Sequence, residues 1–315
     1  MSVSRLFNKV VVTGGAGFIG SNLVDVLLDS GYEIVVLDNF STGKKENLPE
    51  SHAKLSIVSG DVCDRALMQN VLKGADAVVH LAAVASVQQS VEDPEGTHNA
   101  NFIGTLNVLE AAKANNVKRI VFASSAAIYG DTEILPITEA THANPLTPYA
   151  SDKFSSENYL NFYGRETGIE TITFRFFNIF GPRQDPSSPY SGVISIFSDR
   201  AETKSKILVY GDGEQTRDFV FVADLAAILR SALEITALPS GAVNVGSGTT
   251  VSLNELLALI GDLTGNSLEV EYTPPRAGDI RHSLANIERL NKYFPNRNRT
   301  EFKAGLKILL ESKKA

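Results

Sequence analysis

The sequence predicts an α/β fold, in which a doubly wound parallel sheet is followed by a smaller C-terminal lobe. Three observations lead to this prediction. Up to residue 125, short β-branched runs alternate with helical patterns, the runs are apolar on both faces, and a glycine cluster separates the first run from the first helical pattern. Runs that are apolar on both faces are typical of parallel strands covered by helices on both sides.

The elements of this sheet follow in chain order. The β-branched runs predict strands at 10–13, 34–37, 55–58, 77–80 and 119–123. Apolar residues at helical spacing predict helices at 19–30, 66–72 and 103–115. The alternation continues with a helix at 149–166 and a strand at 170–174. These elements form one continuous βα succession.

The pattern changes near residue 181. The segment 181–189 is rich in proline and serine, a composition typical of functional loops. Later, Ser252 and Glu255 have the spacing of a capping box and predict the start of a helix. We therefore expect a dinucleotide-binding domain at 1–180 and a smaller substrate-binding lobe at 181–315, and we allow for a later return of the chain to the sheet.

Composition narrows the classes of protein. The chain of 315 residues has 36 acidic and 29 basic residues and a net charge of -7, which argues against a nucleic-acid surface. The single cysteine, Cys63, excludes an intrachain disulfide and a cysteine-rich zinc site and suits a reducing cytoplasm. Because there is no long apolar stretch, we expect neither a signal peptide nor a membrane span. We expect a cytoplasmic protein without a metal.

The glycine cluster predicts a Rossmann-type dinucleotide site. Gly14 permits a tight turn, Gly17 lets the backbone approach a pyrophosphate, and Gly20 lets helix and strand pack closely. The helix that begins at the neighbouring Phe18 and Ile19 offers free N–H groups to the phosphates. The spacing is G-x-x-G-x-x-G, so the position between a strand and a helix carries the prediction more than the glycines alone.

An acidic residue closes the second predicted strand. Asp38, followed by Asn39, lies eighteen residues after Gly20. A carboxylate there can accept hydrogen bonds from the adenosine ribose and repel a 2′-phosphate, which favours NAD over NADP. Lys44 and Lys45 either soften this preference or form a solvated loop pair.

Further cofactor contacts are expected at the next two strand ends. Asp61 and Val62 follow the third strand and would reach the adenine, although a helix N-cap is an equal alternative for Asp61. Leu81, Ala82 and Ala83 follow the fourth strand, where small side chains let the backbone pass close to the cofactor.

Tyr149 and Lys153 lie one helical turn apart and share a helix face. A tyrosine has an ordinary pKa of about 10, so it acts as a base near neutrality only beside a positive charge. Lys153 can provide that charge, and Ser125 can hydrogen-bond the substrate oxygen that loses its proton. With the glycine cluster, this set predicts an enzyme that moves hydride and proton together. We expect His80 to be a core histidine.

Four further segments carry specific signatures, namely residues 148–153, 175–184, 217–219 and 275–279. Together with the motifs above, they resemble the extended short-chain dehydrogenase/reductases and, within them, the nucleotide-sugar 4-epimerases. The resemblance covers the chain from Gly14 to at least Ser283. It implies that Ser125, Tyr149 and Lys153 are catalytic and that NAD is the cofactor.

The resemblance also implies the substrate contacts. Asn178 matches a residue that holds the sugar diphosphate, and Arg217 and Arg276 match two arginines that clamp phosphates. Guanidinium groups suit phosphate oxygens geometrically, although each arginine alone could serve surface solubility. Asp279 matches a contact to the uridine ribose, and Tyr210 a ring that stacks on uracil.

The residues after Ser125 favour epimerisation. Related dehydratases and decarboxylases carry an acidic residue there, whereas this chain has Ala126, Ala127 and Ile128. Without that carboxylate, dehydration lacks its acid and base. We therefore expect transient oxidation at carbon 4 to a keto sugar and return of the hydride to its other face. A dehydratase, decarboxylase or reductase and a silent NAD sensor remain the alternatives.

The resemblance also addresses the sugar and the assembly. Ser283, seven residues after Arg276, is small, and in the family a small residue there leaves room for an N-acetyl group. We expect UDP-GlcNAc/UDP-GalNAc as the substrate pair, with UDP-glucose/UDP-galactose as the alternative.

The helices near 96–115 and 149–166 predict a homodimer through a four-helix bundle. No nucleic-acid or membrane partner is expected.

Overall fold

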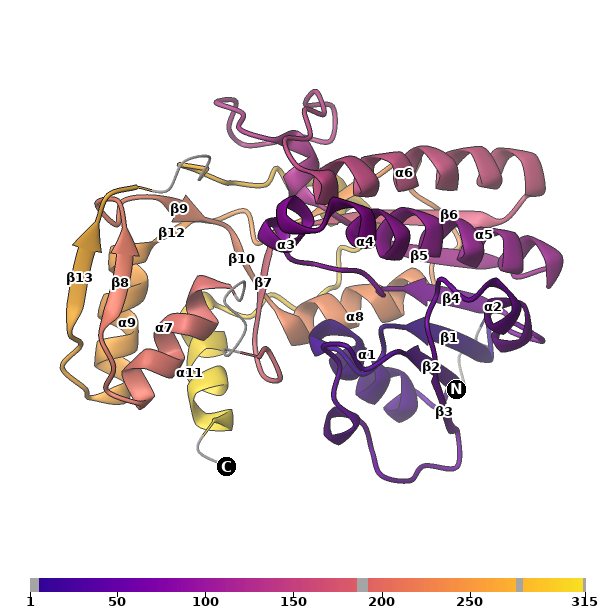
Figure 1. The fold of residues 1–315 in the computed structure, drawn as a ribbon, viewed down its shortest axis with the longest axis horizontal. Coiled ribbons are helices and arrows are strands. Elements are labelled where there is room, and N and C mark those ends of the chain that lie inside the picture. Colours follow the sequence, from indigo (N-terminus) through magenta and orange to yellow (C-terminus); the bar gives the residue numbers. More distant parts are fainter. Residues whose placement is uncertain (1–5, 186–191, 276–279, 314–315) are drawn as a thin grey trace.

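A seven-stranded parallel sheet lies at the centre of the protein, in the order β11-β6-β5-β4-β1-β2-β3 (Figure 1). The computed structural model describes residues 6–185, 192–275 and 280–313. The strands of the sheet are β1 (Lys9–Thr13), β2 (Glu33–Asp38), β3 (Leu55–Ser59), β4 (Ala77–His80), β5 (Arg119–Ser125), β6 (Glu170–Phe176) and β11 (Val243–Val245). The order reverses between β1 and β4, which is where sheets of this kind open a crevice for ligands.

The predicted elements of this half are confirmed. Each of the six predicted strands lies within an observed strand. The four predicted helices are correct to within one residue at either end and are α1 (Phe18–Asp29), α2 (Arg65–Val71), α5 (Gly104–Ala114) and α6 (Pro148–Thr167). The helix predicted near 96–115 covers the π-helical η2 (Asn99–Ile103) and the last residues of α4 (Pro94–His98), whereas α3 (Val87–Glu92) was not predicted.

Helices cover both faces of the sheet, as the apolar pattern predicted. Val10 and Val12 of β1 face one core, in which α1 packs against α8 (Val222–Ala232). Val11 faces the opposite core, which it shares with α2, α5 and α6. The alternation of strand side chains between two apolar cores explains why these runs have no polar face.

The second lobe has its own core. It holds the helices α7 (Val193–Glu202), α9 (Leu253–Thr264) and α11 (Phe302–Ser312). Short strand pairs accompany them: β7 (Asn178–Phe180) with β10 (Phe219–Phe221), β8 (Ile207–Tyr210) with β13 (Val270–Thr273), and β9 (Thr216–Arg217) with β12 (Val251–Ser252). The predicted capping box is confirmed, because Ser252 caps α9 and Glu255 bonds back to the Ser252 N–H.

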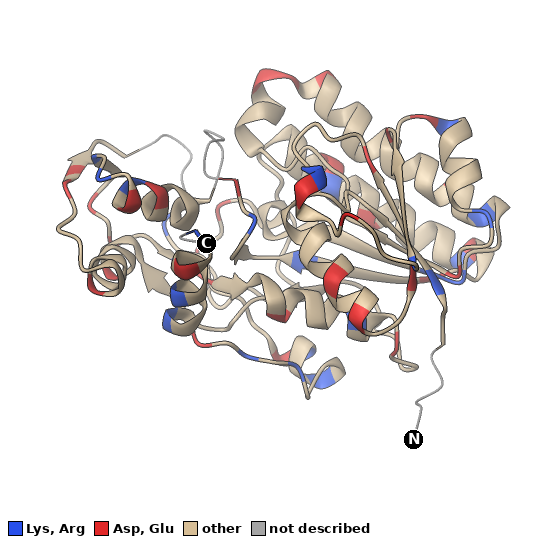
Figure 2. Ribbon diagram, turned by 90° about the horizontal axis from the view of Figure 1, so that it is seen from below, with Lys and Arg blue, Asp and Glu red and all other residues tan. Residues whose placement is uncertain are grey.

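The chain returns to the sheet after entering the second lobe. Helix α8 packs on α1, β11 pairs with β6, and α10 (Glu288–Tyr293) packs beside β11. The division at residue 180 stays a prediction, and the return that it allowed for is visible in these elements. Acidic and basic residues are interspersed over both lobes (Figure 2). Among the described residues, no helix is both long and apolar enough to cross a membrane.

Candidate active site

A cavity of about 590 Å³ opens at the carboxyl ends of the parallel strands. Its wall contains all the residues predicted to bind the cofactor and three predicted to touch the substrate. These are Gly14, Gly17, Phe18, Ile19, Gly20, Asp38, Asn39, Asp61, Val62, Leu81, Ala82, Ala83, Ser125, Tyr149, Lys153, Asn178 and Arg217. One cavity therefore joins the glycine turn, the Ser-Tyr-Lys set and the second lobe.

The glycine turn is closed by contacts that leave no room for side chains. Gly14 has a φ of +67°, and its N–H donates to the Leu37 carbonyl at 2.8 Å. A Cβ at Gly20 would lie 2.1 Å from the Gly14 carbonyl oxygen. Gly17 caps α1 without any side-chain hydrogen bond to the first turn. The bare N–H groups of this helix end lie at the cavity and suit the diphosphate of a dinucleotide.

Asp38 joins the glycine turn to the end of β2. Its buried carboxylate accepts hydrogen bonds from the Ala16 N–H at 2.9 Å and the Phe40 N–H at 2.8 Å. Each carboxylate oxygen has a second lone pair, and Asp38 lines the cavity. The residue can therefore shape the loop and accept bonds from a ribose at the same time.

The structure bears on Lys44 and Asp61, the two residues for which the sequence left alternative roles open. Lys44 forms an ion pair with Asp185 at 3.0 Å, with both side chains partly exposed. Asp61 does not cap α2, because Asp64 does so by accepting from the Leu67 N–H. Burial raises the pKa of Asp61, but hydrogen bonds from Cys63 and from Asn39 outweigh it, so the pKa lies below its ordinary value. Asp61 is thus an anion beside Asn39 on the cavity wall.

His80 is a core histidine in this structure, as expected. Its ring nitrogens lie 2.7 Å from the Thr13 hydroxyl and 2.9 Å from the Thr105 hydroxyl. Burial and, to a lesser degree, the charge of Lys153 lower the pKa of His80 to about 3. The ring is therefore neutral at pH 7 and holds β4 to β1 and α5.

Tyr149 and Lys153 lie in the first two turns of α6, and both side chains are buried. Thr147 caps this helix with a bond from the Ala150 N–H, and Pro148 occupies its first position. The Lys153 ammonium donates to the Ala123 carbonyl at 2.7 Å and lies 5.9 Å from the centre of the Tyr149 ring. Helix α6 thus delivers both groups to the end of β5.

Burial dominates the electrostatics of this pair, although Lys153 was expected to lower the pKa of Tyr149. Burial raises the pKa of Tyr149, and a hydrogen bond with Ser125 opposes this rise. Burial also lowers the pKa of Lys153 to about 8, against the opposing charges of Asp152 and Glu157. Tyr149 therefore keeps its proton at neutral pH in the protein alone, and loss of that proton requires more positive charge beside it.

A second cavity of about 210 Å³ adjoins the first beyond Ser125. Ser125, Asn178 and Arg217 line both cavities, and Ser283 lines the smaller one. The Asn178 amide donates to the Asp218 carbonyl at 3.2 Å. This junction brings the predicted proton-transfer residues next to predicted substrate contacts.

One predicted substrate residue, Tyr210, is not brought into this wall. Tyr210 ends β8 and lines neither cavity, and its backbone carbonyl accepts from the Gln215 amide at 2.6 Å. Arg276 and Asp279 lie outside the described residues.

Sequence reasoning assigned no role to Asp218. Its fully buried carboxylate accepts from the Ser247 N–H at 2.6 Å, the Gly248 N–H at 3.1 Å and the Ala285 N–H at 3.1 Å. It thereby fixes two segments of the second lobe next to Arg217. The available signal was an acidic residue inside the apolar sequence around Phe219.

The chain matches the family model described as "NAD dependent epimerase/dehydratase family" over residues 10–246. It is 39% identical over 282 residues to a "Putative UDP-glucose 4-epimerase" of Methanocaldococcus jannaschii, covering 89% of this chain and 90% of that protein.

Solved structures agree with this match. A UDP-N-acetylglucosamine 4-epimerase from Methanobrevibacter ruminantium, solved with UDP-N-acetylmuramic acid, superposes with a TM-score of 0.94 at 38% identity over 99% of both chains. A UDP-glucose 4-epimerase from Thermus thermophilus, solved with NAD, has a TM-score of 0.88 at 36% identity over 98% of this chain and 99% of that chain. The glycine cradle, the acid at the end of β2 and the proton-transfer residues thus stand in a chain that belongs to the NAD-dependent epimerase/dehydratase family.

Proposed function

We propose that this protein epimerises UDP-hexoses at carbon 4 and that UDP-GlcNAc and UDP-GalNAc are its preferred pair. The proposal rests on the meeting of Tyr149, Ser125 and Lys153 in the wall of the larger cavity, where Ser125 also lines the smaller one. The larger cavity has the cradle for a dinucleotide, and the smaller one has room for a sugar.

The chain's own residues would handle the proton and hold the sugar. Tyr149 would take the proton of the 4-hydroxyl, while Ser125 hydrogen-bonds the same oxygen and Lys153 supplies positive charge. Bound NAD would supply the hydride acceptor and donor and a further positive charge. Asn178 and Arg217 would hold the diphosphate while the keto sugar turns its other face. Tyr149 would then return the proton, so no net oxidation occurs.

The composition of the smaller cavity favours epimerisation over dehydration. Ala126 and Ala127 line it, and none of the described residues in its wall is acidic. Dehydration needs a base for one carbon and an acid for the departing hydroxyl. The described residues of this wall supply no carboxylate for either role, and the ring nitrogen Nδ1 of His282, which also lines it, lies 2.9 Å from the Thr216 hydroxyl. A dehydratase or decarboxylase is therefore the weaker proposal.

The same wall supports an N-acetylated sugar. Ser283 contributes a small, buried side chain, and Ala126 and Ala127 add little bulk. UDP-glucose is the alternative, because the Methanocaldococcus relative carries a UDP-glucose 4-epimerase name. We expect purified protein to convert UDP-GlcNAc to UDP-GalNAc faster than UDP-glucose to UDP-galactose, followed by anomeric-proton NMR without added reductant. Faster conversion of UDP-glucose would overturn the sugar preference, and conversion of neither would overturn the proposed function.

A homodimer and a cytoplasmic location also remain proposals. Val91 on α3 and Tyr159 and Phe162 on the adjacent α6 are between 42% and 57% exposed. A second copy that covers these apolar side chains would remove them from water. Light scattering is expected to give twice the monomer mass at micromolar concentration, and a monomer mass would exclude the dimer.

A further inference from the structure

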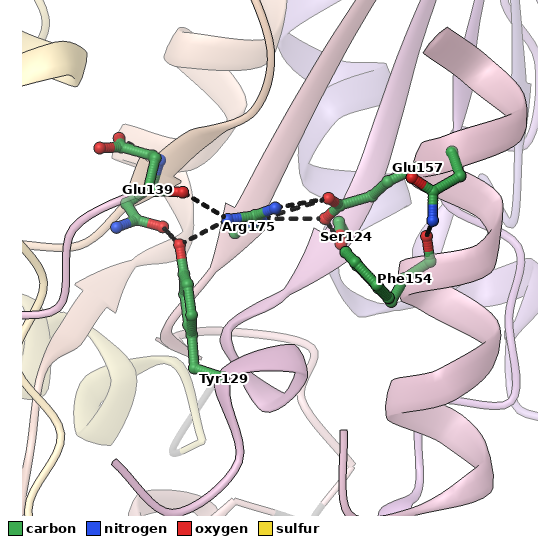
Figure 3. Close-up of polar contacts among 8 residues, drawn as sticks. Ser124, Tyr129, Glu139, Phe154, Glu157 and Arg175 are labelled. Atoms are coloured by element: carbon green, nitrogen blue, oxygen red, sulfur yellow. Dashed lines mark hydrogen bonds and ion pairs between the residues drawn. The ribbon is translucent and has the colours of Figure 1, made fainter. Parts of the chain in front are cut away.

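A buried polar row crosses the sheet one residue before Ser125. Ser124 of β5, Arg175 of β6 and Asn244 of β11 are register partners, and all three are buried. Figure 3 shows Arg175 at the centre of this row, between Glu157 on one side and Tyr129 on the other. The row therefore lies directly beneath the end of the sheet that carries the proton-transfer residues.

Arg175 of this row forms an ion pair with Glu157 of α6. The Arg175 Nε lies 3.0 Å from Glu157 Oε1, and Nη2 lies 2.7 Å from Oε2. On its other side, Arg175 Nη1 donates to the Tyr129 hydroxyl at 2.9 Å and to the Glu139 carbonyl at 3.2 Å. A bidentate pair of this kind fixes both the distance and the orientation of its partners.

Helix α6 forms hydrogen bonds to two consecutive residues of β5. Lys153 donates to the Ala123 carbonyl, and one turn later Glu157 accepts from the Ser124 hydroxyl. The next residue of the strand is Ser125, which bonds to Tyr149 at the start of the same helix. The alignment of the Ser125 and Tyr149 hydroxyls therefore depends on the seating of α6 against β5.

We propose that Glu157 and Arg175 form a positioning pair that holds Ser125 in line with Tyr149 and keeps Lys153 charged. Neither residue lines either cavity, so they would act through others rather than on the substrate. The inference rests on the proposed epimerase function and deepens it, because it extends the proton-transfer apparatus into the sheet.

The charges of Glu157 and Arg175 should both affect the pKa of Lys153. Burial lowers the pKa of Lys153 to about 8, and the negative charges of Asp152 and Glu157 oppose this. The other titratable neighbours are Tyr149 on the same helix and the neutral His80 on β4. The guanidinium of the pair adds positive charge from β6. Loss of the glutamate charge should therefore lower the pKa further, and loss of the arginine charge should raise it.

The test is an NMR titration of the Lys153 side chain, ¹³C-labelled at Cε and assigned with Lys153→Met. We expect Glu157→Gln to lower the midpoint by about one unit or more, and Arg175→Met to raise it. Loosening of the site alone would let water in and raise the midpoint in both variants. Opposite shifts are thus specific for the proposed pair. If Arg175→Met does not fold, the double variant E157Q/R175M is expected to shift the midpoint less than E157Q does.

A second arginine–glutamate pair, at the starts of β5 and β6, provides the control. Arg119 at the start of β5 is buried and lies 2.7 Å from Glu170 at the start of β6, its register partner. Glu170→Gln should leave the Lys153 midpoint unchanged. With UDP-GlcNAc as substrate, the alkaline limb of kcat/KM should move to lower pH in Glu157→Gln only.

The outcomes separate the two proposals. Shifts of the same sign in Glu157→Gln and Arg175→Met, an unchanged midpoint in Glu157→Gln, or a shift in Glu170→Gln as large as that in Glu157→Gln would overturn the claim that the pair keeps Lys153 charged. Absence of turnover in the unaltered protein would overturn only the proposed function, because the titration requires no substrate.

Discussion

The cofactor half and the substrate half of the large cavity are built by different means. In the cofactor half, backbone segments contact one another directly. The Gly14 N–H donates to the Leu37 carbonyl, and a Cβ at Gly14 would lie 2.8 Å from the Ala82 nitrogen. In the substrate half, side chains such as Asn178 and Arg217 extend from two-stranded ladders of short strands. Changes in the first half should therefore alter stability and cofactor binding, whereas changes in the second should alter substrate choice.

The largest effect is expected where the two halves meet. Tyr149→Phe removes the hydroxyl that would exchange the proton but keeps the buried ring, so turnover should fall by about 10²- to 10⁴-fold. The unfolding temperature and the amount of bound NAD should change little. Initial rates with UDP-GlcNAc measure this, and a fall of less than tenfold would exclude Tyr149 as the proton-transfer group.

A methyl group in the glycine turn tests the cofactor half. Gly20→Ala would place a Cβ against the Gly14 carbonyl oxygen, so the turn must shift and the free energy of unfolding should drop by about 1–3 kcal/mol. NAD affinity should fall with it, which calorimetry can measure.

A helical glycine in the second lobe is the matched control. Gly261 lies within α9, and a Cβ there would come no closer than 3.6 Å to its nearest neighbour outside the helix backbone. Gly261→Ala should stabilise the protein by about 0.5–1 kcal/mol and leave NAD binding unchanged. Equal losses of stability in both variants would contradict the difference between the two halves.

Ser283 tests the substrate half. Ser283→Tyr should fill part of the smaller cavity and lower kcat/KM for UDP-GlcNAc by roughly tenfold to hundredfold relative to UDP-glucose, at a steric cost of about 1–3 kcal/mol. The exposed Ser267 of the same lobe allows a control, because Ser267→Tyr should leave this ratio unchanged. An unaltered ratio in Ser283→Tyr would show that this side chain does not set the preference.

The features that the sequence predicts correctly are those that a local pattern encodes. The apolar strands, the helix ends and the glycine turn were predictable because each depends on local pattern or on a fixed backbone geometry. The three-residue strand β11 was not, because its Val-Asn-Val sequence gives too short a pattern and its buried Asn244 resembles a loop residue. Asp64 caps α2, the role that was one of two alternatives for Asp61, because two acidic residues three positions apart give the sequence no means to choose between them.

Contacts between residues that are distant in the chain could not be predicted from the sequence either. The bond from Lys153 to the Ala123 carbonyl and the pairing of Glu157 with Arg175 join a helix to strands that lie elsewhere in the sequence. No local spacing encodes them. The raised pKa of Tyr149 likewise follows from burial, which the Tyr-x-x-x-Lys spacing alone does not report.

If one site removes the hydride from carbon 4 and returns it to the other face of the same sugar, an isotope at carbon 4 must stay with that sugar. Turnover of UDP-GlcNAc that carries deuterium at carbon 4, in ordinary water and without added reductant, measures this. We expect UDP-GalNAc that keeps the deuterium at carbon 4. Loss of the deuterium to solvent, or a product with a changed oxidation level, would contradict it.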